Sequence, residues 1–344
     1  MDKSTWAYAC AMNGVRAGRR IREAVHSLPL AERAQPCTSR LKPGGNVRAD
    51  QVGEEIGIKH LETLSADLGL VIQLLIDGSA APLTIGSSAS KQVVWAYFDA
   101  IDGTIKVAGI ARRSDSGRLR AANDGGWASA MAFTAPTEKP LVDLAIGDFV
   151  VAAIVDGNPP RHATYPPEVI AVPGALGLET YDVSSDEPRR VFTTTIEELS
   201  ESIVFLDGFQ AFDRLSALPG DETLAVELYR TLINRNEVGG AYDVLRQYSN
   251  LNALQRMMLG WRDEPTWYES QGAAFIALNE NLTNLIPAVP IIEGAGGISV
   301  GFDDRPIRER KIADGRASVV HAANERVRAA VLAVVKKARR KRTS

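Results

Sequence analysis

Two aspartates stand three residues apart at the end of an apolar run, directly before a Gly-Thr pair. The run covers residues 93–98, and the aspartates are Asp99 and Asp102. Their carboxylates, with the carbonyl of Ile101 between them, can converge if the chain turns sharply at the end of a strand. Hard cations such as Mg²⁺ take oxygen ligands of this kind. Because Asp-Gly is also ordinary turn chemistry, these residues alone leave both a turn and a metal site open.

The Gly-Thr pair adds a second chemical possibility at the same place. If it opens a helix, the N–H groups of Gly103 and Thr104 point at an anion, and glycine lets that anion approach closely. The threonine also brings a hydroxyl group. A divalent cation beside an anion-binding helix start would make a phosphoester site. Haloacid-dehalogenase-type phosphatases space their two acids at i and i+2, so the i, i+3 spacing argues against that class.

The elements that must position these residues alternate irregularly between helix and strand. Helical periodicity predicts helices over 5–27, 49–68, 222–234, 251–260 and 322–339. Apolar, β-branched runs such as "LVIQLLID", "QVVWAYFD", "WASAMAFTA" and "DFVVAAIVDG" predict strands. Because strict βαβ alternation is absent, we expect an α/β fold of layered sheets and helices rather than one doubly wound sheet.

Composition and charge narrow the class of partner. The 344 residues are 45% hydrophobic and 24% charged, with a net charge of −3, so we expect no nucleic-acid partner. The basic end "KKARRKRTS" is interpreted as a solvated helix end. The sequence contains no apolar run of about 20 residues and no signal-peptide pattern, which predicts a cytoplasmic protein without a membrane partner. Cys10 and Cys37 fit no disulfide framework or zinc pattern.

Two motifs resemble one protein family. The stretch "FDAIDGT" resembles the Asp-Pro-Ile-Asp-Gly-Thr signature of the inositol monophosphatase superfamily, which includes fructose bisphosphatases, with Ala100 in place of the proline. The stretch "IIEGAGGISVGFDDRPI" resembles the family's C-terminal Glu-Ala-Gly-Gly turn and strand. The resemblance extends from about Asn46 onward. It implies an αβαβα sandwich of the sugar phosphatase type and a homodimer.

With this resemblance we divide the chain into three parts. Residues 1–45 would form an N-terminal helix and loop. Residues 46–185 would form an α+β half with the metal and phosphate motif, and residues 186–344 a C-terminal α/β half with the Gly-rich turn.

The resemblance also implies the members of the site. Mg²⁺ would be bound by Asp99, the carbonyl of Ile101, Asp102 and Asn284. Asp50 and Thr104 would act as the catalytic pair that orients water, and Gly103 and Thr104 would bind the phosphate. Arg246 and Glu269 would contact the substrate.

The chain departs from the family's ligand pattern in two places. By sequence comparison, a Gly-Glu-Glu ahead of the signature corresponds to "IGSSAS", so that Ser87 replaces a glutamate ligand. Counting back twelve residues from Gly296 places Asn284 where the family has an aspartate. Both changes remove negative charge, and cation affinity depends on the number of carboxylates. Weak Mg²⁺ binding is therefore the expectation.

Two functions follow from these observations. The favoured one is a Mg²⁺-dependent phosphomonoesterase, a phosphoric monoester hydrolase that acts on a small polyol, sugar or nucleotide phosphate. The alternative is a catalytically altered or inactive family member that serves as a binding or regulatory protein, because Ser87 and Asn284 stand at expected carboxylate positions. The sequence leaves open whether the protein is an enzyme.

Overall fold

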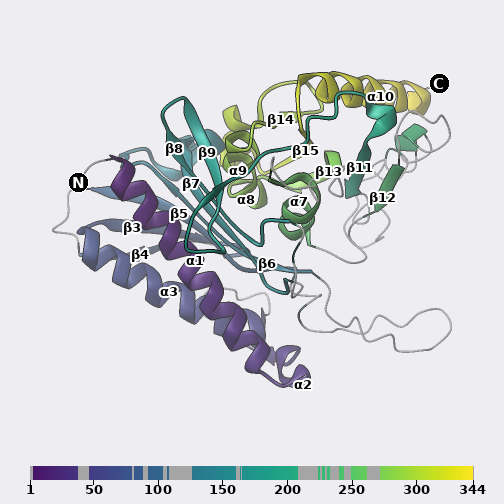
Figure 1. Cartoon of the computed structure of the whole chain (residues 1–344). Helices are drawn as coiled ribbons and strands as arrows, with labels where there is room; N and C mark the ends of the chain where they lie inside the picture. The colour runs from purple at the N-terminus through teal and green to yellow at the C-terminus, as the bar shows by residue number, and fades with distance from the viewer. Residues whose placement is uncertain are drawn as a thin grey trace.

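The computed structural model shows five layers in the order helix, sheet, helix, sheet, helix (Figure 1). It describes residues 3–37, 46–79, 81–87, 92–103, 107, 126–159, 163, 165–207, 224, 227–228, 231–232, 240–243, 249–261 and 272–343. The α/β fold class and the αβαβα sandwich expected from the sequence are therefore confirmed.

The first sheet has eight strands in the order β10-β9-β8-β7-β6-β5-β3-β4. Their bounds are β3 Val71–Ile76, β4 Leu83–Ile85, β5 Val93–Asp102, β6 Ala128–Thr134, β7 Phe149–Asp156, β8 Glu168–Gly174, β9 Gly177–Asp182 and β10 Arg189–Arg190. Strands β3 and β5 are parallel, and every other neighbouring pair in this sheet is antiparallel. The carboxyl ends of β3 and β5 therefore lie side by side.

The second sheet has five strands in the order β12-β11-β13-β15-β14. Their bounds are β11 Ile203–Asp207, β12 Gly240–Asp243, β13 Gly272–Asn281, β14 Ile298–Gly301 and β15 Arg316–Ala322. Strand β11 is parallel to both of its neighbours, whereas β15 is antiparallel to β13 and β14. A two-stranded ribbon of β1 (Pro36–Cys37) and β2 (Asn46–Val47) stands apart from both sheets.

Two long helices cover the outer face of the first sheet (Figure 1). They are α1 (Lys3–Ser27) and α3 (Arg48–Leu68), and the single-turn helix α2 (Leu30–Arg33) follows α1. Small residues permit the close packing: a Cβ at Gly18 would lie 2.7 Å from Val155, and one at Gly57 would overlap the ring of Phe98. Burial of the apolar side chains between these helices and the sheet forms the first core.

The middle layer consists of α7 (Asn250–Met258), α8 (Leu282–Leu285) and α9 (Ala288–Gly294). Side chains of this layer and of both sheets' inner faces form the second core. The outer face of the second sheet is covered by α10 (Glu325–Thr343), which forms the third core (Figure 1). Short 3-10 turns occupy Leu141–Asp143, Ile146–Asp148, Leu199–Glu201, Ile307–Glu309 and Ile312–Asp314.

The sequence-based elements agree with these bounds except at the last helix. Strand β15 extends to Ala322, so the helix begins at Glu325 rather than at residue 322. Most of the helix expected over 222–234 lies outside the described residues. Within the described residues, no helix has the length and apolar character needed to cross a membrane.

Candidate active site

Strand β5 delivers the signature to the space between the two sheets. Because side chains alternate across a strand, Tyr97 and Asp99 share one face, while Phe98 and Ala100 share the other. Tyr97 packs in the core between the sheets, and Phe98 packs beneath the outer helices. Asp99 is 7% exposed. The strand therefore carries this carboxylate toward the middle layer.

The signature then breaks the regular ladder. The pairing of β5 with β6 shifts register between Asp99 and Asp102, and Gly103 has a φ of 94°. A carboxylate oxygen of Asp99 accepts a hydrogen bond from the N–H of Ile101 at 3.1 Å. This local bond stabilises the turn and brings both aspartates to one end of the strand.

Asp102 faces the amino-terminal end of helix α7. Its Oδ2 accepts a hydrogen bond from the N–H of Leu251 at 2.7 Å. Ser249, the N-cap residue, also forms a hydrogen bond with this carboxyl group, and its side chain accepts from the N–H of Asn252. The first N–H groups of a helix have no partner within the helix, and they favour a nearby negative charge. The amino-terminal end of α7 therefore stabilises the negative charge of Asp102.

A second buried acid, Glu280, ends strand β13. It is 3% exposed, and its two oxygens accept from two amide groups, Asn250 Nδ2 at 2.9 Å and Asn284 Nδ2 at 2.7 Å. The other side of the Asn284 amide, Oδ1, accepts from the hydroxyl of Tyr97 at 3.4 Å. Glu280 thus orients Asn284 so that the carbonyl oxygen of this amide points to Tyr97.

The negative charges of four carboxylates act on the buried Tyr97 hydroxyl. Burial and the negative charges of Asp77, Asp99, Asp102 and Glu280 raise the pKa of Tyr97 well above its ordinary value. Within the described part of the chain, neither Asp102 nor Glu280 forms an ion pair with a cationic side chain. The site therefore concentrates negative charge in a region shielded from water.

The same shielding raises the pKa values of two of the acids themselves. Burial, which the hydrogen bonds from Ser249 and Leu251 partly offset, raises the pKa of Asp102 to about 6. Burial raises the pKa of Glu280 to about 7, and the neighbouring charge of Asp102 adds to this increase. A bound cation or a shared proton would relieve this concentration of charge.

Helix α3 places Asp50 near the signature. Asp50 lies in the first turn of α3 and is 6% exposed. One turn later, a Cβ at Gly53 would lie 2.9 Å from that of Ala100, so the start of this helix crosses directly over the signature turn. The other proposed catalytic residue, Thr104, and the two substrate residues, Arg246 and Glu269, lie outside the described residues.

The structure corrects the position assigned to Ser87. Strand β4 runs antiparallel to β3, with Ile85 opposite Ile72, so Ser87 follows β4 at the amino ends of β3 and β5. At about 3.3 Å per residue, that is roughly 20 Å from the carboxyl ends where Asp99 lies. Ser87 therefore does not stand in for a ligand of this site, and the sequence comparison at that segment was wrong.

Asp77 occupies the place that the sequence comparison gave to Ser87. It directly follows β3, and its N–H donates to the carbonyl of Phe98 at 3.0 Å. Sequence reasoning missed both Asp77 and Glu280, although each acid ends a long apolar strand run, "LVIQLLID" and "AAFIALNE". This is the same signal that identified Asp99. A search for acids at strand ends would therefore have found both.

The oxygen donors fit a hard divalent cation. The set consists of carboxylates, the Asn284 amide and a backbone carbonyl, without sulfur or imidazole ligands. Asn250 Oδ1 is buried and has no hydrogen-bond partner among the described residues, and it lines a cavity of about 10 Å³ together with Glu280 and Asn284. No three acidic, His or Cys side chains of the described residues converge on one point. The donors are therefore of the right kind, but those among the described residues do not form a closed cage.

Comparison with known proteins was made at three levels. No family model matches the sequence, and no curated protein matches it. Among solved structures, the chain is similar to the extragenic suppressor protein SuhB of Bartonella henselae (TM-score 0.60, 18% identity, covering 95% of this chain and 98% of that one). It is also similar to the Thermotoga maritima IMPase (TM-score 0.59, 11% identity, covering 95% of this chain and 97% of that one). A third similar structure is the fructose-1,6-bisphosphatase of Leishmania major (TM-score 0.63, 13% identity, covering 96% of this chain and 94% of that one). The resemblance indicated by the motifs is thus confirmed at the level of fold: the chain has the layered fold of the inositol monophosphatase and fructose bisphosphatase structures.

Proposed function

We propose that the protein is a Mg²⁺-dependent phosphomonoesterase that acts on a small polyol, sugar or nucleotide phosphate. The observation that carries this proposal is the placement of acids where the carboxyl ends of the parallel strands β3 and β5 lie side by side. Asp77 follows β3, Asp99 and Asp102 end β5, and their charges, with that of Glu280, act on the same buried Tyr97. In parallel α/β sheets, ligands bind outside the carboxyl ends of the strands, and β3 and β5 are the parallel pair of this sheet. The fold shared with structures described as an IMPase and a bisphosphatase gives independent support.

The cation would be bound by Asp99, the carbonyl of Ile101 and Asp102, with Asp77 as an added acid that the sequence comparison did not include. Asn284 would offer its Oδ1, because Glu280 already holds the opposite side of this amide. When bound, Mg²⁺ would polarise the phosphate ester and help to activate water.

The chain's own residues would do the remaining work. Gly103, whose φ is positive, lies in a turn, and its N–H group and that of Thr104 would bind the phosphate oxygens. Asp50, buried at the start of α3, would accept a proton from the attacking water and orient it together with the Thr104 hydroxyl. Arg246 and Glu269 would contact the alcohol part of the substrate.

Phosphate release from a panel of polyol, sugar and nucleotide phosphates tests this function. The purified protein should release phosphate from at least one ester in Mg²⁺, and EDTA should abolish the release. Absence of release from every ester, with the protein folded by circular dichroism, would contradict the proposal.

One set of contacts favours the alternative, a binding or regulatory protein built on the same fold. Both oxygens of Glu280 and one oxygen of Asp102 are already satisfied by protein N–H groups, and the cavity beside them is only about 10 Å³. A remodelled site of this kind would bind a phosphate ester without hydrolysing it. Calorimetry with Mg²⁺ separates the two functions, since tight stoichiometric binding argues against the alternative.

Three further expectations stay predictions. They are the homodimer, the cytoplasmic location and the division of the chain into residues 1–45, 46–185 and 186–344. Size-exclusion chromatography with light scattering would test the first of them.

A further inference from the structure

Helix α7 contacts two acids of the candidate site, Asp102 and Glu280, through its first turn. The N–H of Leu251 donates to Asp102, and the side chain of Asn250 donates to Glu280. The position of this nine-residue helix therefore decides whether the two donors meet the two acids.

The other end of α7 is fixed by an ion pair on strand β7. Arg256 donates to both oxygens of Asp156, from Nε at 2.9 Å and from the terminal NH2 at 3.1 Å, and also to the carbonyl of Asn158 at 2.7 Å. Asp156 is fully buried, and the Arg256 side chain is 15% exposed. The hydroxyl of Tyr165 donates to the same carboxylate at 2.5 Å, and the guanidinium group lies over the Tyr165 ring.

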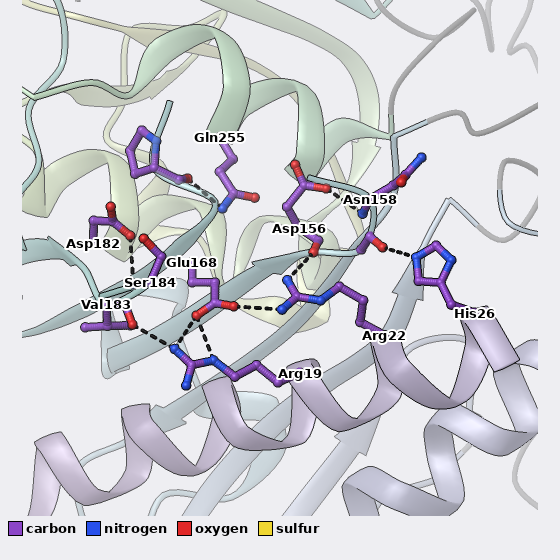
Figure 2. A network of polar contacts seen from close by, with 12 residues as sticks. Arg19, Arg22, His26, Asp156, Asn158, Glu168, Asp182, Val183, Ser184 and Gln255 are labelled. Carbon is purple, nitrogen blue, oxygen red and sulfur yellow. Dashed lines mark hydrogen bonds and ion pairs between the residues drawn. The ribbon is translucent and has the colours of Figure 1, made fainter. Parts of the chain in front are cut away.

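Two neutral amides also attach α7, but each is only half satisfied. Asn252 donates to the carbonyl of Trp127. Gln255 donates to the carbonyl of Pro166 (Figure 2). The carbonyl oxygens of both amides are buried without a hydrogen-bond partner among the described residues. Charge-assisted, bidentate bonds are about twice as strong as neutral ones. Arg256 therefore contributes more to the position of α7 than either amide.

Strand β7 is itself tied to the outer helix at the same point. Arg22 of α1 donates to the backbone carbonyl of Asp156 and to the carboxylate of Glu168, which Arg19 also binds (Figure 2). The Asp156 carboxylate thus belongs to a strand that α1 holds in place. Because Arg19 contacts Glu168 and Val183 but no residue of α7, it provides a matched control within one network.

We infer that Arg256 is a positioning residue of the candidate site: its ion pair with Asp156 holds helix α7 so that Leu251 and Asn250 meet Asp102 and Glu280. This inference rests on the proposed function for its catalytic meaning, and on the contacts above for the positioning itself. Arg256 would act through α7 and would not touch the substrate.

Amide hydrogen exchange tests the positioning directly. We expect Arg256→Gln to accelerate exchange in the peptide covering residues 249–258 at least tenfold, and Arg19→Gln to change it less than twofold. The double variant Arg256→Gln/Asp156→Asn, which leaves no unpaired buried charge, should show the same acceleration if the single variant folds poorly. Unchanged exchange in both Arg256 variants, or equal acceleration in Arg19→Gln, would overturn the inference.

Mg²⁺ affinity adds a readout that a merely structural role would not move. Well below the melting temperature, Arg256→Gln should weaken Mg²⁺ binding by about tenfold, which is about 1.4 kcal/mol. Arg256→Lys should recover part of this loss, because the charge remains while the bidentate geometry is lost. If the wild-type protein binds no Mg²⁺, the proposed function fails, and the exchange experiment alone decides the positioning role. If the wild type binds Mg²⁺ and Arg256→Gln binds it equally well, the inference fails and the proposed function stands.

Discussion

Individual carboxylates at strand ends determine the chemistry of this site. Among the described residues, Asp102 and Glu280 accept hydrogen bonds from N–H groups and form no ion pair with a cationic side chain. This differs from the ion-paired acids elsewhere in the molecule, such as Asp156 with Arg256. The site acids Asp102 and Glu280 therefore differ from a structural acid such as Asp156 in their partners, which are N–H groups in the first case and a cationic side chain in the second.

Asp102→Asn should abolish phosphate release while the protein stays folded. Asn retains an oxygen that can accept from the N–H of Leu251, so α7 keeps its contact, whereas the negative charge is lost. Loss of a carboxylate ligand should lower turnover by at least about 100-fold, because even outer-shell changes at metal sites cost about 10–100-fold. Turnover in Mg²⁺ is compared with the wild type after circular dichroism establishes folding. A variant with wild-type turnover would exclude Asp102 from the site.

Adding a carboxylate should affect Mg²⁺ affinity differently at two positions. Ser87→Glu should leave Mg²⁺ affinity unchanged, because Ser87 lies at the amino ends of β3 and β5. Asn284→Asp would place a carboxylate where Asn284 now donates to Glu280 at 2.7 Å. We expect it to tighten Mg²⁺ binding about tenfold if the cation reaches this position, since an added charge there is poorly screened. Calorimetry on both variants measures the two affinities, and a Mg²⁺ response to Ser87→Glu would refute the strand register argument.

Helices and strands decide where those acids stand, and α3 packs very closely against β5. Gly57 faces the ring of Phe98, the residue before Asp99, without room for a Cβ. The helix therefore lies against the strand that ends in the signature. Any shift of α3 away from this strand would move Asp50 as well.

Gly57→Ala should destabilise the protein by about 1–3 kcal/mol, because the added methyl group overpacks the contact. Thr63→Ala is the control, since Thr63 lies exposed on the same helix and should change stability by less than about 0.5 kcal/mol. Urea denaturation of both variants gives the free energies of unfolding. Equal stability of Gly57→Ala and the control would show that α3 and β5 are not packed as closely as described.

At the scale of the whole molecule, the acids make stability depend on pH. The pKa of Glu280 is raised from 4.5 to about 7, and that of Asp102 from 3.8 to about 6. Over this range the folded protein holds more protons than the unfolded chain, so the free energy of unfolding falls as pH rises through about 4 to 7. His321 acts in the opposite direction, because burial lowers its pKa from 6.5 to about 4 and its contribution rises with pH.

The difference in unfolding free energy between the wild type and Glu280→Gln isolates the contribution of the Glu280 carboxyl group. We expect this difference in unfolding free energy to shift against the wild type by about 2.5 kcal/mol between pH 5 and pH 8, as a pKa raised from 4.5 to about 7 implies. His321 is present in both proteins, so its contribution cancels. Urea denaturation in EDTA at pH 5, 6, 7 and 8 gives the values. A difference that does not vary with pH would mean that Glu280 ionises in the folded protein as easily as in the unfolded chain.

The sequence alone determined the fold class and the identity of one half of the site. Hydrophobic periodicity located α1, α3 and α7 to within a few residues, because burial of an apolar face leaves a periodic trace in the local sequence. The Asp-x-x-Asp-Gly-Thr spacing indicated Asp99, Asp102 and Gly103 as candidate site residues, because one turn at a strand end brings residues close in sequence together.

Tertiary structure decided the remaining half of the candidate site. Asp77 and Glu280 approach Asp102 from β3 and β13, two strands that lie far apart in the chain. Strand order and direction bring them together, and those depend on how whole sheets pack rather than on any local pattern. The same reason explains the error at Ser87, since only the antiparallel pairing of β4 reveals that this residue stands at the opposite end of the sheet.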